Sequence, residues 1–179
     1  MPTYKQSITD CPTIYVSAGY PSYPEGGVHR GIDTVHTNHL AYAPVSGTVI
    51  VAQVWDGHST EGNQSWGNMI LVQMEDGNTW RAAHFESQLW HVGDTISKGD
   101  YIGTQGKTGN ATGIHTHWEY ATASGTLMDP STILGIPNAV GTWDVEWDAT
   151  DPPGPGPGPE PTPGGNIPIW LLFKFSKWR

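Results

Sequence analysis

The sequence predicts an all-β protein, a mostly antiparallel β-sandwich or folded sheet with a cleft bordered by loops. The chain has 179 residues with 23 Gly and 15 Pro but only 14% charged residues, a composition typical of many short strands joined by tight turns. Apolar runs of strand length recur between turn signals rich in Gly, Asp and Asn. Because the single Cys11 cannot form an internal disulfide, the core or a bound metal has to supply the stability.

Three apolar runs give the clearest strand signals. Thr13 to Ser17 is short, and a β-branched run from Thr48 to Trp55 follows a turn at Gly47. Asn68 to Glu75 is apolar at both odd and even positions, as expected for a strand buried on both faces. The Asp-Gly pair after this run predicts a hairpin turn, with TWRAAHFES as the returning strand.

Two histidines lie at the start of another predicted strand, in the segment GNATGIHTHWEY. His115 and His117 are two residues apart, and side chains at i and i+2 of a strand leave the same face. Imidazole is both the commonest metal ligand and the usual general base near neutral pH, so one ring could bind a metal while the other moves protons. A pair of surface histidines is the alternative, but the Gly-rich lead-in KTGNATG favours a pocket rim because it lets the chain turn abruptly.

A second group of ligand-type side chains occurs in VHRGID. His29 and Asp33 are four residues apart, and Gly31 between them lets the backbone bend. Together with another histidine they would make a set of two imidazoles and one carboxylate, which leaves a fourth position for water. This is the pattern of a catalytic zinc and not of a structural one.

The remaining histidines have simpler interpretations. His84 ends the returning strand beside Ala82 and Ala83, whose small side chains leave space around the ring, so it is either a core residue or part of a site. His36 and His39 form an H-x-x-H without helical context, which predicts an exposed loop pair. The histidines at positions 58 and 91 lie in polar, turn-rich segments and are predicted to be solvated.

Composition divides the chain into three parts. Residues 1–140 form the predicted domain, residues 141–165 an acidic and then Pro/Gly-rich linker, and residues 166–179 a short apolar and basic segment. Residues 1–165 hold five basic and all 17 acidic side chains, a net charge of −12, which argues against a nucleic-acid partner because phosphates require Lys and Arg. No stretch approaches the roughly 20 apolar residues of a membrane span.

Several motifs now combine into a family resemblance that covers Tyr23 to Pro130. In order and spacing, the chain is similar to the lysostaphin-type (LytM-like) zinc endopeptidases, which cut peptide bonds in peptidoglycan. The segments that carry the resemblance are VHRGID, SWGN, RAAHFES, VGDTISKGDYIGTQGKTGNATG and IHTHWEY. Two departures stand out: AAHF replaces the usual YAHL, and HTNH follows Asp33 where the family often has small or apolar residues.

The resemblance implies roles for six residues. His29, Asp33 and His117 would bind Zn²⁺, and the cleft of the predicted fold would be a zinc cleft. The catalytic residues would be His115, His84 and Tyr23, with the two histidines as the proton-transferring pair and the tyrosine assisting the transition state.

Further expectations concern the surroundings of this site. Glu119 follows His117 on the same strand face and is either an orienting partner of that ligand or an ordinary salt-bridged or solvated glutamate. We expect the cleft walls to be the loops Ala18 to Val28, Asp56 to Trp66 and Gly103 to Gly113, which suit an extended peptide of peptidoglycan.

The resemblance leaves two functions open: an active endopeptidase, or a non-catalytic wall-binding or structural module of the same fold. Because the N-terminus MPTYKQSITD lacks an apolar signal region, we expect a monomer made in the cytoplasm without a signal peptide. It would reach the wall after holin-type release, or as part of a phage particle. Residues 166–179 would either attach to a membrane or envelope surface, or fold back on the domain or pack against another chain.

Overall fold

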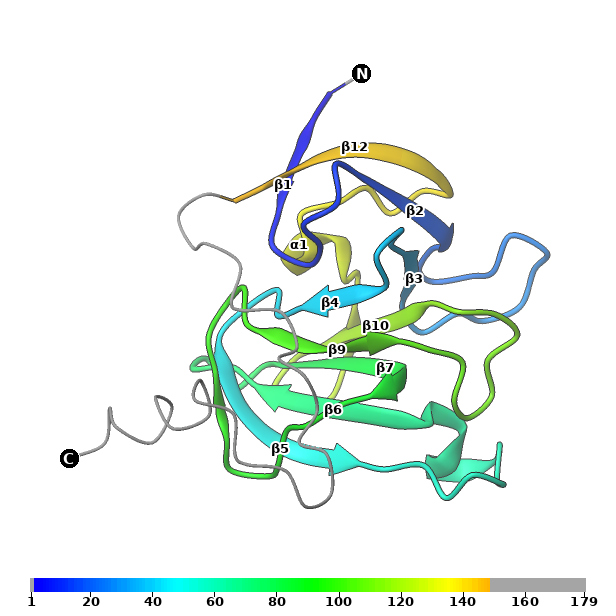
Figure 1. The fold of residues 1–179 in the computed structure, drawn as a ribbon, viewed down its shortest axis with the longest axis vertical. Helices are drawn as coiled ribbons and strands as arrows, with labels where there is room; N and C mark the ends of the chain where they lie inside the picture. The colour runs from blue at the N-terminus through cyan, green and yellow to red at the C-terminus, as the bar shows by residue number, and fades with distance from the viewer. Residues whose placement is uncertain (1, 149–179) are drawn as a thin grey trace, which may run out of the picture.

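The computed structural model describes residues 2–148 and shows a β protein built around one large, folded sheet (Figure 1). Within these residues there are twelve strands, one 3-10 helix and one short α-helix. In chain order they are β1 (Tyr4–Gln6), β2 (Thr13–Ala18), β3 (Ile32–Val35), β4 (Leu40–Tyr42), β5 (Gly47–Gln53), η1 (Gly62–Trp66), β6 (Asn68–Gln73), β7 (Thr79–Ser87), β8 (Thr95–Ile96), β9 (Tyr101–Gln105), β10 (Thr116–Ala121), β11 (Leu127–Met128), α1 (Ser131–Leu134) and β12 (Gly141–Trp147). The predicted all-β class is confirmed.

The sheet is largely antiparallel and its centre is β10. The strand order is β1-β12-β2-β3-β10-β7-β6-β5-β8, and within it only β1 and β12 pair in parallel. β9 pairs with both β4 and β7, so the sheet folds over on itself. β10 pairs with β3 on one side and β7 on the other, with His117 opposite both Asp33 and Ala83. The three strands that hold Asp33, His117 and His84 are therefore direct neighbours.

Successive side chains of β10 point alternately into the core and into the site. Trp118 is 1% exposed and packs in the core with Trp80, their ring centroids 6.5 Å apart. The neighbouring His117 and Glu119 leave the opposite face, because successive side chains of a strand alternate. Burying a large aromatic ring contributes on the order of 2 to 3 kcal/mol, so the core packing of Trp118 also holds the two polar neighbours on the other face.

The predicted end of the domain at residue 140 requires correction. β12 (Gly141–Trp147) lies in the segment assigned to the linker, yet it pairs with β2 and β1, and its Val145 is buried in the core. Its acidic residues Asp144 and Glu146 occupy the exposed, alternate positions of the strand. The acidity that suggested a linker is thus the polar face of a strand. The predicted linker beyond residue 148 and the segment 166–179 lie outside the described residues.

Loops gather at one end of the sheet. In Figure 1 the connections between β2 and β3, β5 and β6, and β9 and β10 all project to the right. They contain most of the three predicted wall segments, which begin in part within the strands: Ala18 ends β2, and residues 103–105 belong to β9. Across residues 2–148, no helix combines the length and apolar character that a bilayer crossing requires.

The prediction that His36 is an exposed loop residue also requires correction, because this residue is fully buried. Its Nδ1 lies 2.8 Å from the Leu40 carbonyl oxygen, to which it donates, and its backbone N–H donates to the Gln105 side chain. Burial lowers the pKa of His36 to about 4, although the Leu40 hydrogen bond raises it in part. The ring is therefore neutral in the folded protein at pH 7.

This burial predicts a pH-dependent stability. Between about pH 6.5 and pH 4 the unfolded chain binds a proton at His36 that the folded protein does not, so stability falls as the pH falls through this window. From pH 7 to pH 4 the wild type should lose about 3 kcal/mol more free energy of unfolding than the His36→Gln variant. Urea unfolding of both proteins at matched pH and zinc concentration measures the difference. Parallel stability curves would contradict the buried, neutral state of this ring.

Candidate metal centre and active site

Three buried side chains converge at the junction of β3 and β10. His117 Nδ1 lies 2.7 Å from Asp33 Oδ1, and His29 Nε2 lies 3.1 Å from His117 Nδ1 and 3.2 Å from Asp33 Oδ1. All three residues are buried. Within residues 2–148 they are the one group of His, Cys, Asp or Glu side chains whose ligand atoms are close enough to hold a metal ion.

Strand pairing and one glycine create this convergence. Asp33 and His117 are direct partners in the register of β3 and β10. His29 precedes β3, and the chain between them passes so close to β10 that a Cβ on Gly31 would lie 2.0 Å from the Trp118 carbonyl oxygen and 2.9 Å from the His117 ring. Any side chain at position 31 would therefore push the two histidines apart.

Hydrogen bonds orient the two imidazoles. His29 Nδ1 lies 2.7 Å from the Gly19 carbonyl oxygen, to which it donates, so its Nε2 faces the other ligand atoms. His117 has the opposite orientation: Nδ1 faces Asp33 and Nε2 lies 3.9 Å from Glu119 Oε1. A metal-binding histidine commonly directs its second nitrogen at a carboxylate or a carbonyl oxygen, and both rings follow this rule.

The electrostatics of the trio favour a cation. Burial alone would raise the pKa of Asp33, but hydrogen bonds from His117 and His29 outweigh it and hold that pKa well below its usual range. Burial would lower the pKa of His117, yet Asp33 and Glu119 raise it. The surroundings thus favour positive charge between the three side chains. Two imidazoles and one carboxylate with this geometry fit a zinc ion that keeps one position open for water.

Two further histidines lie beside this centre. His84 Nδ1 lies 2.9 Å from the Thr108 carbonyl oxygen, and His115 Nδ1 lies 2.9 Å from that of Gly113. Each Nδ1 donates, which leaves each Nε2 as a proton acceptor. The two ring centroids are 4.8 Å apart, and His115 Nε2 lies 3.7 Å from Asp33 Oδ1. Burial, with the nearby His115 and His117, lowers the pKa of His84 to about 4, so this ring is neutral at pH 7.

The backbone at His84 is unusual for a strand. Its φ is +67°, in the left-handed region that residues with a side chain seldom occupy, and the pairing of β7 with β6 is irregular close to it. Such a conformation costs of order 1 to 3 kcal/mol and is concentrated at functional sites. Here it accompanies a ring placed against His115.

The predicted walls line the cleft beside the metal centre. Tyr23 and Val28 come from the first predicted loop, Ser65 and Trp66 from the second, and Asn110 from the third. The Tyr23 ring stacks on that of His29 with centroids 4.2 Å apart and planes 29° apart. Burial and the Asp33 carboxylate raise the pKa of Tyr23, which keeps its hydroxyl protonated as a hydrogen-bond donor.

The structure thus brings together all six residues singled out by sequence, and it adds Arg30, Arg81 and Trp66, to which the sequence analysis gave no individual role. Glu119 pairs with both Arg30 and Arg81, and Trp66 lies against the Arg81 guanidinium, 4.3 Å from its ring centroid. Both proposed descriptions of Glu119 hold at once, since it is salt-bridged and also faces His117. The available signal was the i, i+2 spacing of His117 and Glu119, which places an acid beside the ligand but does not show which cations approach it.

The remaining histidines lie elsewhere. His58 and His91 are exposed, as predicted, and neither lines the cleft. His39 is half-buried, with φ +58°, outside the cleft. Its Nδ1 has no hydrogen-bond partner among the described residues.

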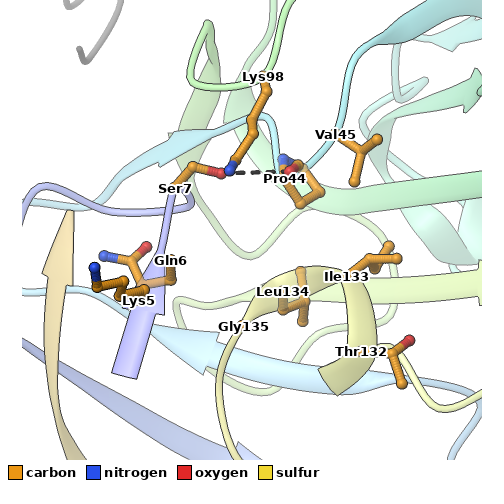
Figure 2. Close-up of a pocket in the computed structure, with 10 residues that line it drawn as sticks. All are labelled: Lys5, Gln6, Ser7, Pro44, Val45, Lys98, Thr132, Ile133, Leu134 and Gly135. Carbon is orange, nitrogen blue, oxygen red and sulfur yellow. Dashed lines mark hydrogen bonds between the residues drawn. The ribbon is translucent and has the colours of Figure 1, made fainter. Parts of the chain in front are cut away.

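A second hollow lies between β1, the turn before β5 and α1, and Figure 2 shows the residues that line it. They are Lys5, Gln6, Ser7, Pro44, Val45, Lys98, Thr132, Ile133, Leu134 and Gly135. None of these is a histidine, cysteine or carboxylate, so this hollow offers neither a zinc ligand nor a general base. Its Lys98 is already paired with Asp148 at 2.6 Å. Of these two hollows in residues 2–148, the cleft of the metal centre is therefore the one that offers zinc ligands.

The chain is similar in sequence to known proteins. Over 98 residues the chain is 36% identical to morphogenesis protein 1 of Bacillus phage B103, which covers 50% of this chain and 26% of the phage protein. Over 105 residues it is 30% identical to the peptidoglycan DD-endopeptidase ShyC of Vibrio cholerae, which covers 59% of this chain and 22% of that protein. The chain thus spans about a quarter of the length of these relatives.

A solved structure and a family profile complete the comparison. The catalytic domain of the antimicrobial peptidase lysostaphin from Staphylococcus simulans superposes with a TM-score of 0.53 at 29% identity, over 66% of this chain and 90% of that domain. Residues 27–130 match the profile of Peptidase family M23. This match extends over more than half of the chain and contains five of the six site residues, all but Tyr23. The chain therefore belongs to Peptidase family M23.

Proposed function

We propose that this protein is a zinc endopeptidase that hydrolyses peptide bonds in bacterial peptidoglycan. The observation that carries the proposal is the intact group His29, Asp33 and His117, buried and correctly oriented in a chain of Peptidase family M23. The names of two similar proteins support this proposal, because both describe peptidases: ShyC is named a peptidoglycan DD-endopeptidase, and lysostaphin an antimicrobial peptidase.

The residues can carry out peptide hydrolysis as follows. When bound by the trio, Zn²⁺ supplies a Lewis acid and lowers the pKa of water to about 7. The Nε2 atoms of His115 and His84 accept a proton from the attacking water and return it to the leaving amine. The Tyr23 hydroxyl donates a hydrogen bond to the oxygen on which negative charge develops. His29 stacks on Tyr23 and so keeps that hydroxyl beside the metal centre.

A non-catalytic wall-binding or structural module is the second candidate function. Such a module would not need a complete set of ligands and proton acceptors. This chain retains the three ligands and both additional histidines, each with its Nδ1 tied to a backbone carbonyl oxygen. Because these two histidines are present and their rings are also oriented for proton transfer, an enzyme is favoured over a non-catalytic module.

We also propose that the protein is a phage or prophage lysin. The similarity to morphogenesis protein 1 of Bacillus phage B103 supports this origin, and with it synthesis in the cytoplasm followed by holin-type release or incorporation into a phage particle. We further propose that it acts as a monomer.

The first prediction concerns activity and its metal. Purified protein loaded with one Zn²⁺ should release new amino termini from isolated cell walls, detectable by mass spectrometry of the soluble products. His117→Ala removes one of three ligands and should lose both tight zinc binding and product release. Walls of several cross-link types identify the bond that is cut. Stoichiometric zinc in the variant would refute the ligand assignment, and an inactive zinc-loaded wild type would favour the non-catalytic module.

The second prediction separates ligands from proton-transferring residues. His115→Ala should keep its zinc but lose about 10² to 10⁴-fold in turnover, the usual contribution of a general acid or base. His84→Ala should behave in the same way with a smaller loss. Elemental analysis and steady-state kinetics on one preparation measure both quantities. Loss of zinc from His115→Ala equal to that from His117→Ala would overturn these roles.

The third prediction concerns residues 166–179, which carry a net charge of +3 and a largely apolar sequence. We propose that this segment attaches the enzyme to a membrane or envelope surface. Deleting it should weaken binding to anionic vesicles and whole cells, and should leave hydrolysis of a small soluble peptide unchanged. Uncharged vesicles serve as the control surface. Unchanged binding by the truncated protein would mean that the segment folds back or packs against another chain.

A further inference from the structure

An arginine stands at the entrance of the cleft with most of its hydrogen-bonding capacity unused. The Arg30 side chain is 57% exposed and lines the same cleft as Tyr23, Trp66 and His117. Its Nε donates to Glu119 Oε1 at 3.1 Å, which is the one interaction of this guanidinium with the described part of the chain. A guanidinium has five N–H donors, so four remain available to a molecule in the cleft.

The charge around Arg30 is not balanced by the protein. Glu119 is the carboxylate partner of two guanidinium groups, because Arg81 also pairs with it. Arg81 is largely buried and stacks on Trp66, so it is the inner member of the cluster. One negative charge between two positive ones leaves the cleft wall with an excess of one positive charge, and Arg30 is the member that reaches solvent.

This excess contrasts with the rest of the chain. Residues 1–165 carry a net charge of −12 and only five basic side chains. Two of these five, Arg30 and Arg81, meet beside a proposed zinc ligand, while Lys5 and Lys98 pair with carboxylates away from the cleft. A positive wall in an acidic body attracts anionic molecules to that wall in particular.

The position of Arg30 also relates to the bond that would be cut. Glu119 Oε1 lies 3.1 Å from Arg30 Nε and 3.9 Å from His117 Nε2. The guanidinium is therefore separated from the ligand by little more than one carboxylate. An extended peptide advances about 3.3 to 3.6 Å per residue, so a substrate passing the metal centre would present a side chain or terminus to Arg30 within about two residues of its scissile bond.

From these observations we infer that Arg30 is a specificity-determining residue that binds a carboxylate of the substrate. Planar guanidinium groups bind carboxylates through paired hydrogen bonds, which fix position as well as charge. The inference rests on the proposed peptidoglycan endopeptidase function and names its substrate class. The preferred substrate is a stem peptide with a free carboxylate near the cleaved bond, and not an uncharged oligoglycine cross-bridge.

Matched substrates test this inference. Cross-linked muropeptide dimers, in which two stem peptides are joined directly, are used in two forms: with free carboxylates, and with the carboxylates converted to amides. Pentaglycine with an acetylated amino terminus and an amidated carboxyl terminus is the third, uncharged substrate. The zinc-loaded full-length protein should cleave the free-carboxylate dimers with a kcat/KM about tenfold higher than the amidated dimers, as expected for one charge-assisted hydrogen-bonded pair. Pentaglycine should be cleaved more slowly than either.

Variants then assign this preference to Arg30. Arg30→Gln should raise KM for the free-carboxylate dimers about tenfold with little change in kcat, and should leave kinetics on the amidated dimers unchanged. Arg30→Lys keeps the positive charge but lacks the planar pair of N–H donors, so its KM for the free-carboxylate dimers should lie between those of the wild type and Arg30→Gln. Lys5→Gln is the matched control, since it removes one positive charge at an exposed position of β1 and should behave like the wild type. Zinc content should be the same in all four proteins.

The outcomes separate this inference from the function on which it rests. If the protein cleaves pentaglycine or the amidated dimers as well as the free-carboxylate dimers, the carboxylate preference is wrong and the endopeptidase function stands. The same holds if Arg30→Gln loses activity equally on both dimers, because a purely structural role of the Glu119 pair would have that effect. If the zinc-loaded protein cleaves none of the three substrates or the isolated walls, the proposed function itself fails.

Discussion

The pairing of β3 with β10 is the constraint on which the rest of the structure depends. It sets Asp33 directly opposite His117, with their side-chain atoms 2.7 Å apart. Since side chains alternate along a strand, shifting the register by one residue would exchange the polar face of β10 for its core face. The site and the core therefore cannot be optimised separately. Trp118, whose indole donates to Thr34 of β3, locks the register from the core side.

The metal centre is organised by orientation as much as by residue type. Three of its histidines donate Nδ1–H to backbone carbonyl oxygens, and the fourth, His117, directs its Nε2 toward Glu119. Backbone carbonyl groups are fixed by the sheet and its loops, so the ring orientations follow from the fold. Glu119 differs because its position depends on two arginine side chains. Burial alone would raise the pKa of Glu119, but the neighbouring His117 ring, the charge of Arg81 and the hydrogen bond from Arg30 lower it below its usual value, so a negative charge stays beside His117.

What could be predicted from the sequence was local in character. The spacing of His115 and His117, the H-x-x-x-D of His29 and Asp33, and the turn-rich composition each depend on residues near in sequence, and the motifs that they form pointed to the family. The approach of Arg30 and Arg81 to Glu119 depends on three different segments, so no spacing shows it. The prediction for His36 was wrong for the same reason: its backbone N–H is bonded to Gln105 of β9, 69 residues away in the sequence. β12 was missed because its polar face was taken for linker acidity.

The loops of the cleft are also less independent than their sequences suggest. Directly after the second wall, Asn68 N–H at the start of β6 donates to Thr108 Oγ1 of the third wall at 2.9 Å, and a Cβ on Gly67 would lie 2.4 Å from the Thr108 carbonyl oxygen. That same carbonyl oxygen accepts the Nδ1–H of His84. Trp66, the last residue of the second wall, directly precedes Gly67, and its ring centroid lies 5.4 Å from that of His117. One close backbone contact thus sets the position of a proton-accepting histidine and of the aromatic side chain beside a metal ligand. Loop substitutions that widen the cleft for another peptide would consequently disturb His84, unless they leave this contact unchanged.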